Sequence, residues 1–346
     1  MSRTDNSDTD LRIGLVGAGR TGLAFGRACE RLEGCRLTAV CDSKPERAAG
    51  IAGAKPFQEI ADLLEFPEID ALVVATSVNH RGGIALRALE HGLSVLVEGP
   101  ISEDESVVQE IATVVAKSQG KLVCGVSRPM RLTERARKLK ELTDGAFGRP
   151  HRMQWTLTDR FCPEIFVSGP DEEEAMAQGA LTLELVEELD LLLWLLGEPE
   201  GVEASRCLGK HHDAEVEDEV FFRFAWEDGA TGSVISSSGE IPGVDRLEMM
   251  GDRGLLVSER GLPIQWNRTE TSVEEFSRSS EERGNELPLW NIEIAVEDSD
   301  LECLLEAVVL DFSEGISFGS KAITGPQDEL ILLRLLKQIA RLVGNR

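Results

Sequence analysis

Tyrosine is absent from the sequence, so no phenolic hydroxyl is available as a proton donor or acceptor. Basic side chains are scarce as well, since 36 lysines and arginines stand against 62 aspartates and glutamates and leave a formal net charge of −26. A surface of this sign repels the phosphates of nucleic acids and the headgroups of anionic membranes. The composition therefore argues against nucleic acid and membranes as partners.

Long apolar runs and paired cysteines are also lacking. The longest apolar run, residues 189–196, is interrupted by Asp190 and is far shorter than the ~20 residues of a membrane span. Seven cysteines without a C-x-x-C pair fit neither a disulfide framework nor a zinc ribbon. Residues 1–10 lack the basic and apolar regions of a signal peptide and are expected to be a disordered tail. We therefore expect a soluble protein of the reducing cytoplasm.

Strand-like and helix-like segments alternate over the first 126 residues. Apolar runs lie at residues 11–16, 37–41, 71–76, 94–97 and 121–126. Helical stretches lie between them, at residues 21–33, 45–52, 83–91 and 105–119. Short, continuously apolar strands that alternate with helices are typical of a parallel, doubly wound sheet. Beyond residue 150 the strands become longer and alternating, with a hairpin signal at Asp228-Gly229.

Two domains are expected from this change of texture. The sequence predicts an α/β protein with a doubly wound parallel sheet at residues 11–127 and a C-terminal α/β domain, with a large, mostly antiparallel open sheet, at residues 128–346. Long helices are predicted at residues 180–196 and 327–343. The acidic, serine-rich stretch at residues 269–286 is expected to be a loop.

A glycine-rich turn, Gly17-Ala18-Gly19-Arg20-Thr21-Gly22, follows the first strand and opens a helix. In the motif G-x-G-x-x-G the first glycine allows the tight turn, the second lets a pyrophosphate approach the backbone, and the third allows close packing of helix and strand. The N-terminus of the helix adds partial positive charge. Asp42 ends the second strand, where a carboxylate binds the ribose hydroxyls. The sequence therefore predicts a Rossmann domain that binds a nicotinamide dinucleotide.

The choice between NAD and NADP depends on Asp42. A carboxylate at this position repels the extra phosphate of NADP, which favours NAD. Ser43 and Lys44 beside it keep NADP open as the alternative.

Several segments resemble the glucose-fructose oxidoreductase / inositol dehydrogenase family (Gfo/Idh/MocA), from residue 11 to about residue 340. They are RIGLVGAGRTG, AVCDSKPERA, DALVVATSVNHRGGIALRALEHGLSVLVEGP, LTDGAFGRP and LDLLLWLLGEP. The resemblance implies oxidation or reduction of a small sugar, polyol or related carbonyl compound with NAD(P). It also implies that Thr76 and Glu98 line the cofactor site. We expect the C-terminal sheet to have an apolar outer face that a homo-oligomer covers.

The family's catalytic residues do not all match. Its E-K-P triplet appears as Glu98-Gly99-Pro100, so the lysine is replaced by glycine. The family's aspartate and histidine on the long helix fall on Leu183 and Glu187. Arg128 matches the arginine after the last Rossmann strand, which implies a substrate-binding role.

Other side chains are candidates for the vacated roles. Glu187 occupies the acid/base position, with Glu184 and Glu188 beside it, so one carboxylate with a raised pKa is a candidate for proton transfer. A solvated acidic helix edge is the alternative. His80, in the loop after the third main strand, is a second candidate. His211-His212-Asp213 has no third ligand at suitable spacing, so we expect no metal site.

Two functions agree with these features. The first is an NAD(P)-dependent oxidoreductase with an atypical active site. The second is a non-catalytic dinucleotide-binding or interaction protein derived from the same family. The two differ in turnover and not in cofactor affinity.

Overall fold

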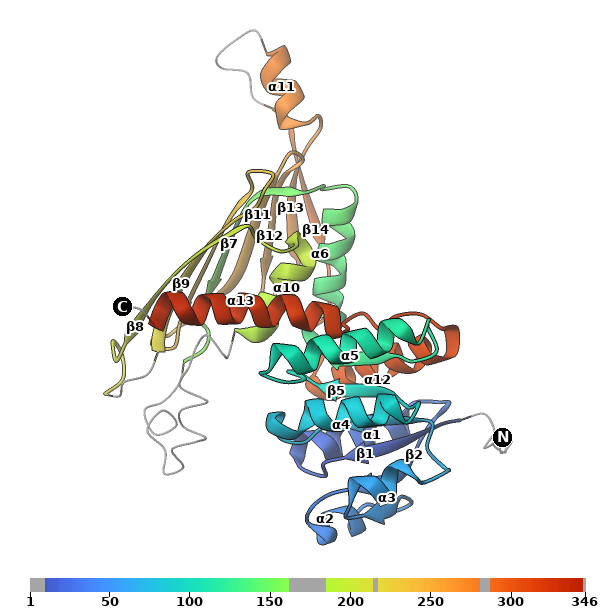
Figure 1. Ribbon diagram of the computed structural model, residues 1–346. Coiled ribbons are helices and arrows are strands. Elements are labelled where there is room, and N and C mark those ends of the chain that lie inside the picture. The colour runs from blue at the N-terminus through green and yellow to red at the C-terminus, as the bar shows by residue number, and fades with distance from the viewer. Residues whose placement is uncertain (1–9, 162–184, 214–216, 281–286, 345–346) are drawn as a thin grey trace. The chain divides into compact units, whose positions relative to one another are not determined.

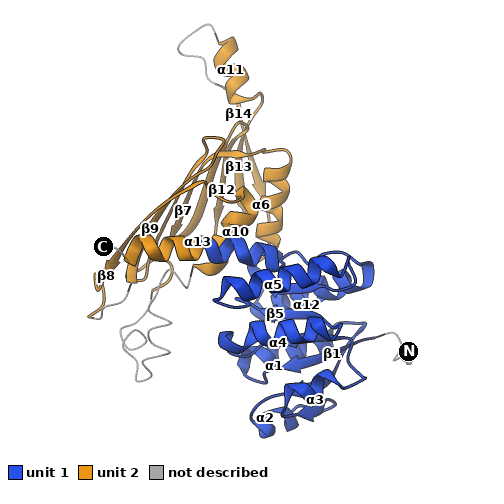
Figure 2. Ribbon diagram, in the orientation of Figure 1, with its two compact units in different colours: residues 1–132, 299–334 blue, residues 133–298, 335–346 orange. Residues whose placement is uncertain are grey.

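The computed structural model describes residues 10–161, 185–213, 217–280 and 287–344, and Figure 1 shows its helices and strands. The chain divides into two compact units, one made of residues 1–132 and 299–334 and the other of residues 133–298 and 335–346 (Figure 2). Residues 299–334 thus belong with the first unit, although they come late in the sequence. The domain ranges expected from the sequence, residues 11–127 and 128–346, stay predictions.

A parallel sheet forms the centre of the first unit. Its strands are β1 (Leu11–Val16), β2 (Cys35–Cys41), β3 (Lys55–Phe57), β4 (Ala71–Val74), β5 (Ser94–Glu98) and β6 (Cys124–Ser127). They stand in the order β3-β2-β1-β4-β5-β6, and each neighbouring pair is parallel. The strand order reverses between β1 and β4, which is where a doubly wound sheet binds its ligand. The predicted doubly wound parallel sheet is confirmed.

Helices pack on both faces of this sheet. They are α1 (Arg20–Arg31), α2 (Pro45–Ala49), α3 (Ile60–Leu64), α4 (Val78–Glu90), α5 (Glu105–Lys117), the 3-10 helix Pro129–Leu132 and α12 (Leu301–Phe318). One core joins α4 and α5 to the strands through residues such as Ala85 and Ile111. The other core joins α1 and α12 to the opposite face through Phe25 and Phe312. Helix α4 begins earlier than the expected residue 83.

A second sheet forms the centre of the other unit. Its strands are β7 (Pro150–Leu157), β8 (Gly201–Leu208), β9 (Glu217–Ala225), β10 (Thr231–Ser237), β11 (Asp245–Gly251), β12 (Gly254–Glu259), β13 (Ile264–Thr269) and β14 (Leu289–Ile294). The order is β14-β13-β12-β11-β7-β10-β9-β8, and β7 and β10 form the parallel pair in an otherwise antiparallel sheet. The predicted large, mostly antiparallel sheet is confirmed.

Two helices, α6 (Glu134–Asp144) and α10 (Val186–Leu196), are tied to this sheet by hydrogen bonds. The Trp226 indole, just past β9, donates to the carbonyl of Gly197 at the end of α10 at 3.0 Å. Arg135 of α6 donates to the carbonyl of Leu262, just beyond β12, at 3.0 Å. Residues 180–184 of the predicted long helix lie outside the described residues. Helix α13 (Pro326–Gly344), close to the predicted last helix, begins in the first unit and ends in the second.

The outer face of the antiparallel sheet is less apolar than expected. Along the central strand β7 the buried side chains Met153, Trp155 and Leu157 alternate with Arg152, Gln154 and Thr156. The polar set stands on the opposite face because successive side chains of a strand alternate. The expectation of an apolar outer face is therefore wrong for β7, although Phe221 of the neighbouring hairpin is 38% exposed.

The stretch at residues 269–286 also differs from expectation. Helix α11 (Val273–Ser279) forms within it. The Ser272 side chain accepts a hydrogen bond from the backbone N–H of Glu275, whose carboxylate accepts one from the N–H of Ser272. This capping box satisfies two of the N–H groups that begin a short helix, and its S-x-x-E pattern is visible in the sequence.

Among the described residues, no helix combines the length and the apolar character that crossing a membrane requires.

Candidate functional site

The turn after β1 is shaped by glycines at positions where a side chain would collide. Gly17 has a φ of +93°, and a Cβ there would strike the carbonyl oxygen of Ala75 after β4. A Cβ at Gly22 would strike the carbonyl oxygen of Gly17. Gly19, in contrast, has no atom within 4 Å of where its Cβ would be. The open space at residue 19, at the N-terminus of α1, fits the pyrophosphate of a dinucleotide.

Asp42 lies directly after β2 and is buried, with 8% of its surface exposed. One carboxylate oxygen accepts the N–H of Ala18 at 2.7 Å, and the other accepts the N–H of Lys44 at 2.8 Å. A carboxylate has about four lone-pair positions, so both oxygens keep capacity for ribose hydroxyls. Asp42 therefore fixes the glycine turn and also presents acceptors beside it.

Arg81 of α4 joins the two backbone segments that follow β4 and β5 at the carboxyl end of the sheet. Its guanidinium donates to the carbonyls of Thr76 at 2.7 Å and Gly99 at 3.0 Å, and it pairs with the Glu98 carboxylate at 2.7 Å. Burial lowers the pKa of Arg81, and the nearby Arg128 lowers it further, whereas Glu98 opposes the shift. Two of the predicted cofactor-site residues, Thr76 and Glu98, are therefore held by one side chain.

The glycine at position 99 makes room for Arg128. A Cβ at Gly99 would lie 2.7 Å from the Arg128 guanidinium carbon. Arg128 follows β6 and pairs at 2.8 Å with Glu329 of α13, and the two residues are 4% and 2% exposed. The backbone N–H of Ile101 also donates to Glu329, at 3.3 Å. A lysine at position 99 would therefore displace a guanidinium that is held in place by a buried ion pair.

The remaining predicted site residues are more scattered. Arg20 is exposed and Thr21 half-buried in the first turn of α1. His80 is exposed in the first turn of α4. Glu187 is half-buried in the first turn of α10. Leu183 lies outside the described residues. The catalytic roles of His80 and Glu187 and the substrate-binding role of Arg128 stay predictions.

A group of charged side chains in the second unit has little signal in the sequence. Glu188 of α10 is 3% exposed and forms an ion pair with Arg160, which follows β7. Burial raises the pKa of Glu188 to about 7, although Arg160 opposes the shift. The sequence gives Glu188 only as a neighbour of Glu187 and gives no signal for Arg160. The sequence also gives no signal for Glu329, which pairs with Arg128 although the two residues are 201 positions apart.

The backbone of the two neighbouring histidines binds one carboxylate. The backbone N–H groups of His211 and His212 donate to the Asp218 side chain, and the His212 ring nitrogen Nδ1 lies 3.6 Å from the same oxygen. Burial raises the pKa of Asp218, but the hydrogen bonds that its carboxylate accepts from backbone N–H groups, those of His211 and His212 among them, outweigh burial and lower the pKa. Within the described part of the chain, no three metal-ligating side chains gather in one place.

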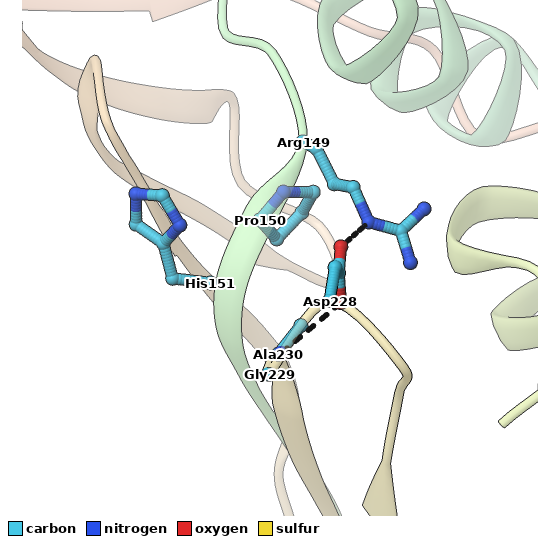
Figure 3. Close-up of a pocket in the computed structure, with 6 residues that line it drawn as sticks. All are labelled: Arg149, Pro150, His151, Asp228, Gly229 and Ala230. Atoms are coloured by element: carbon cyan, nitrogen blue, oxygen red, sulfur yellow. Dashed lines mark hydrogen bonds and ion pairs between the residues drawn. The ribbon is translucent and has the colours of Figure 1, made fainter. Parts of the chain in front are cut away.

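A hollow of about 270 Å³ lies at the start of β7 (Figure 3). Figure 3 shows that the β9–β10 turn forms one wall, where Asp228 accepts the N–H of Ala230 at 3.1 Å and pairs with Arg149. Gly229 has a φ of +85°, and β9 and β10 are antiparallel, so the predicted hairpin is confirmed. These contacts close the turn between β9 and β10.

Comparison with known proteins agrees with this geometry. A family model described as "Oxidoreductase family, NAD-binding Rossmann fold" matches residues 11–126, and the model of the GFO/IDH/MocA C-terminal domain matches residues 136–257.

Among similar sequences, inositol 2-dehydrogenase 4 of Saccharopolyspora erythraea is 33% identical over 198 residues, which are 56% of this chain and 56% of that protein. The chain thus spans little more than half of that relative's length. Inositol 2-dehydrogenase of Rhizobium meliloti is 28% identical over 73% of this chain and 77% of its own.

Among solved structures, an oxidoreductase from Agrobacterium radiobacter in complex with NAD+, L-tartaric acid and magnesium has a TM-score of 0.77 at 16% identity, covering 97% of each chain. UDP-N-acetylglucosamine 3-dehydrogenase from Acidithiobacillus ferrooxidans has a TM-score of 0.75 at 18% identity and covers 96% of this chain and 98% of its own. At these identities the likeness shows the fold.

Proposed function

Because the chain belongs to the GFO/IDH/MocA oxidoreductase family and carries its NAD-binding Rossmann fold, we propose that it is an oxidoreductase that prefers NAD(H) and acts on a small sugar, polyol or carbonyl compound. The observation that carries the proposal is the glycine turn, where residues 17 and 22 exclude side chains and residue 19 faces open space. The inositol dehydrogenases among its relatives support the substrate class.

Each part of the cofactor would meet a group of the first unit. Gly17, Gly19, Arg20, Thr21 and Gly22 would hold the pyrophosphate. Asp42 would accept the ribose hydroxyls and repel a phosphate in their place. Thr76 and Glu98 would lie beside the nicotinamide, which supplies or receives the hydride when bound. The negative charge of Asp42 is the reason to expect NAD before NADP.

The site around Gly99 is atypical for this family. In place of a lysine side chain, the guanidinium of Arg128 occupies the space beside residue 99, and Glu329 holds it there. We expect a proton donor or acceptor to come from Glu187, from His80 or from a neighbouring carboxylate. The replacement of lysine also favours the alternative function, a dinucleotide-binding protein that does not turn over.

We further propose that the protein is a cytoplasmic homo-oligomer that associates through the open face of the second sheet. Phe221 and the half-buried Ile235 stand next to each other on that face, and burying these apolar side chains in an interface would stabilise an oligomer. Light scattering at micromolar concentration measures the oligomeric state, and a monomer at ordinary salt would contradict this proposal.

Cofactor preference is tested by calorimetric titration with NADH and NADPH. We expect NADH to bind more tightly than NADPH. Asp42→Ala should weaken NADH binding because the acceptors for the ribose hydroxyls are lost, and it should narrow the difference in affinity between the two cofactors because the charge that repels the extra phosphate of NADPH is lost. Asp42→Asn keeps the shape without the charge and separates the two effects. Equal affinity of the wild type for both cofactors would show that Asp42 is not the selector.

Turnover separates the two proposed functions. Steady-state assays in both directions over a panel of polyols and sugars should show slow or absent turnover, because a missing acid or base typically costs ~10² to 10⁴-fold in rate. A kcat in the ordinary range of ~1 to 10³ s⁻¹ on inositol or glucose would show that the replacements are compensated. NADH binding without any turnover would favour the non-catalytic function.

A further inference from the structure

Charged side chains gather at one end of the second sheet, where β7 and β12 end and β11 begins. They are Asp159 and Arg160 after β7, Asp245 in β11, Arg260 after β12 and Glu188 in the first turn of α10. Arg260 pairs with Asp159 at 2.6 Å and with Asp245 at 2.9 Å. Arg160 pairs with Glu188. Strand pairing holds the cluster together, since Asp245 is the register partner of Leu157, the last residue of β7.

Exposure rises from Glu188 outward. The Glu188 side chain is 3% exposed, Arg160 is 21% exposed and Arg260 is 58% exposed. The second carboxylate oxygen of Glu188, Oε2, is buried and has no hydrogen-bond partner among the described residues. A buried ion pair with an unsatisfied oxygen is costly to fold. Packing alone gives no reason to retain such a pair, whereas a function for the guanidinium that reaches the surface does.

We propose that Arg160 is a substrate-contacting residue and that Glu188 positions its guanidinium, so that this end of the sheet binds the hydroxyl oxygens of a neutral sugar or polyol. The inference rests on the proposed function and names the substrate's charge class. At pH 8, where Glu188 is ionised, three carboxylates and two guanidinium groups give the cluster a net negative charge, which repels an anionic sugar acid. Arginine N–H groups donate to neutral hydroxyl oxygens without needing a negative ligand.

The ion pair gives the site a pH dependence. Burial raises the pKa of Glu188 to about 7, Arg160 lowers it, and Asp245 and Glu187 raise it further. Below that pH the carboxyl group is protonated and no longer orients Arg160 by its charge. Affinity for a neutral polyol should therefore be highest at about pH 8 and above, and should fall as the pH falls through about 7. The charged groups that act on Glu188 or are acted on by it are Arg160, Glu187, Asp245 and Arg260, and Asp159 pairs with Arg260.

The titration also affects stability, and this test needs no ligand. The folded state holds the Glu188 proton more tightly than the unfolded state, so ionisation destabilises the fold as the pH rises from about 5 to about 7. Relative to Glu188→Gln, the wild type should lose a few degrees of Tm over that range. The exposed pair of Arg223 and Glu203 provides a control, and Glu203→Gln should follow the wild type. Parallel curves for wild type and Glu188→Gln would overturn the titration of Glu188.

Binding is measured by calorimetry on NADH-saturated protein, with myo-inositol as the neutral probe and glucuronate as the anionic probe, from pH 5.5 to 8.5. In the wild type we expect myo-inositol to bind about tenfold more weakly at pH 5.5 than at pH 8, by loss of the orienting charge. Glu188→Gln should bind weakly at every pH. Arg160→Gln should lose at least about tenfold at pH 8, and Arg160→Lys should retain part of the affinity.

The outcomes separate this inference from the proposed function. Unchanged inositol affinity in Arg160→Gln, or tighter binding of glucuronate than of inositol at pH 8, overturns the inference and leaves the proposed function standing. Loss of the pH step in Glu187→Gln instead of Glu188→Gln assigns the role to Glu187 and also overturns it. Wild-type protein that binds NADH and no inositol, glucose or other neutral polyol overturns the proposed substrate class and this ligand together.

Discussion

The glycine turn after β1 and the ion pairs around Gly99 lie at the same edge of one parallel sheet, yet they are built in different ways. The turn depends on residues 17–22, where backbone meets backbone and the absence of side chains creates the space. The surroundings of Gly99 depend on long side chains, with Arg128 and Glu329 meeting from distant parts of the sequence. The first design is local and the second is tertiary, so they should respond differently to mutation.

The largest effect is expected from the buried ion pair. Glu329→Gln removes the buried carboxylate that pairs with Arg128 and should destabilise the protein by about 3 to 5 kcal/mol. Glu306→Gln removes a partner of Arg31 from a partly exposed pair between α1 and α12 and should cost less than about 1 kcal/mol. Urea unfolding of the two variants measures the contrast.

A double variant tests whether the lost stability comes from the unbalanced charge. Arg128→Met combined with Glu329→Gln removes both charges and should recover part of the lost stability. If Glu329→Gln costs no more than Glu306→Gln, the surroundings of Gly99 do not depend on the pair, and the proposed contrast with the glycine turn fails.

A smaller effect separates two glycines of the turn. Gly17→Ala places a methyl group against the carbonyl of Ala75 at a positive φ and should destabilise the fold by about 1 to 3 kcal/mol. Gly19→Ala places the same methyl group in open space and should change stability by no more than about 0.5 kcal/mol. It should nevertheless weaken NADH binding by at least about tenfold, because the methyl group enters the space proposed for the pyrophosphate. Thermal unfolding and NADH titration of both variants decide, and unchanged NADH affinity in Gly19→Ala would place the pyrophosphate elsewhere.

The same distinction explains what could be predicted from the sequence. The parallel sheet and the glycine turn follow from local patterns, since apolar runs alternate with helices and G-x-G-x-x-G stands at a strand end. The sequence around helix α11 points both ways, since its acidic, serine-rich composition favours a loop whereas the capping box that Ser272 begins favours a helix. The contact between Arg128 and Glu329 has no local signature.

The replacement of lysine by Gly99 illustrates the limit most clearly. The sequence alone indicates that this replacement removes a positive charge. In the structure the guanidinium of Arg128 lies where a side chain of residue 99 would begin. Similarly, the alternating polar residues of β7 were present in the sequence, yet which sheet face they occupy became clear only with the strand pairing.

The late return of the chain to the first unit has a consequence for synthesis on the ribosome. Strand β6 ends at Ser127, whereas α12, which packs beside α1 on one face of the sheet, ends at Phe318, about 190 residues later. At about 5 to 20 residues per second, that face would wait roughly 10 to 40 s for its cover. During this interval Phe25 and its apolar neighbours lack Phe312 and the rest of α12. A nascent chain of this protein is therefore expected to expose an apolar surface for longer than one whose Rossmann unit is continuous in sequence, and surfaces of this kind are the ones that chaperones bind.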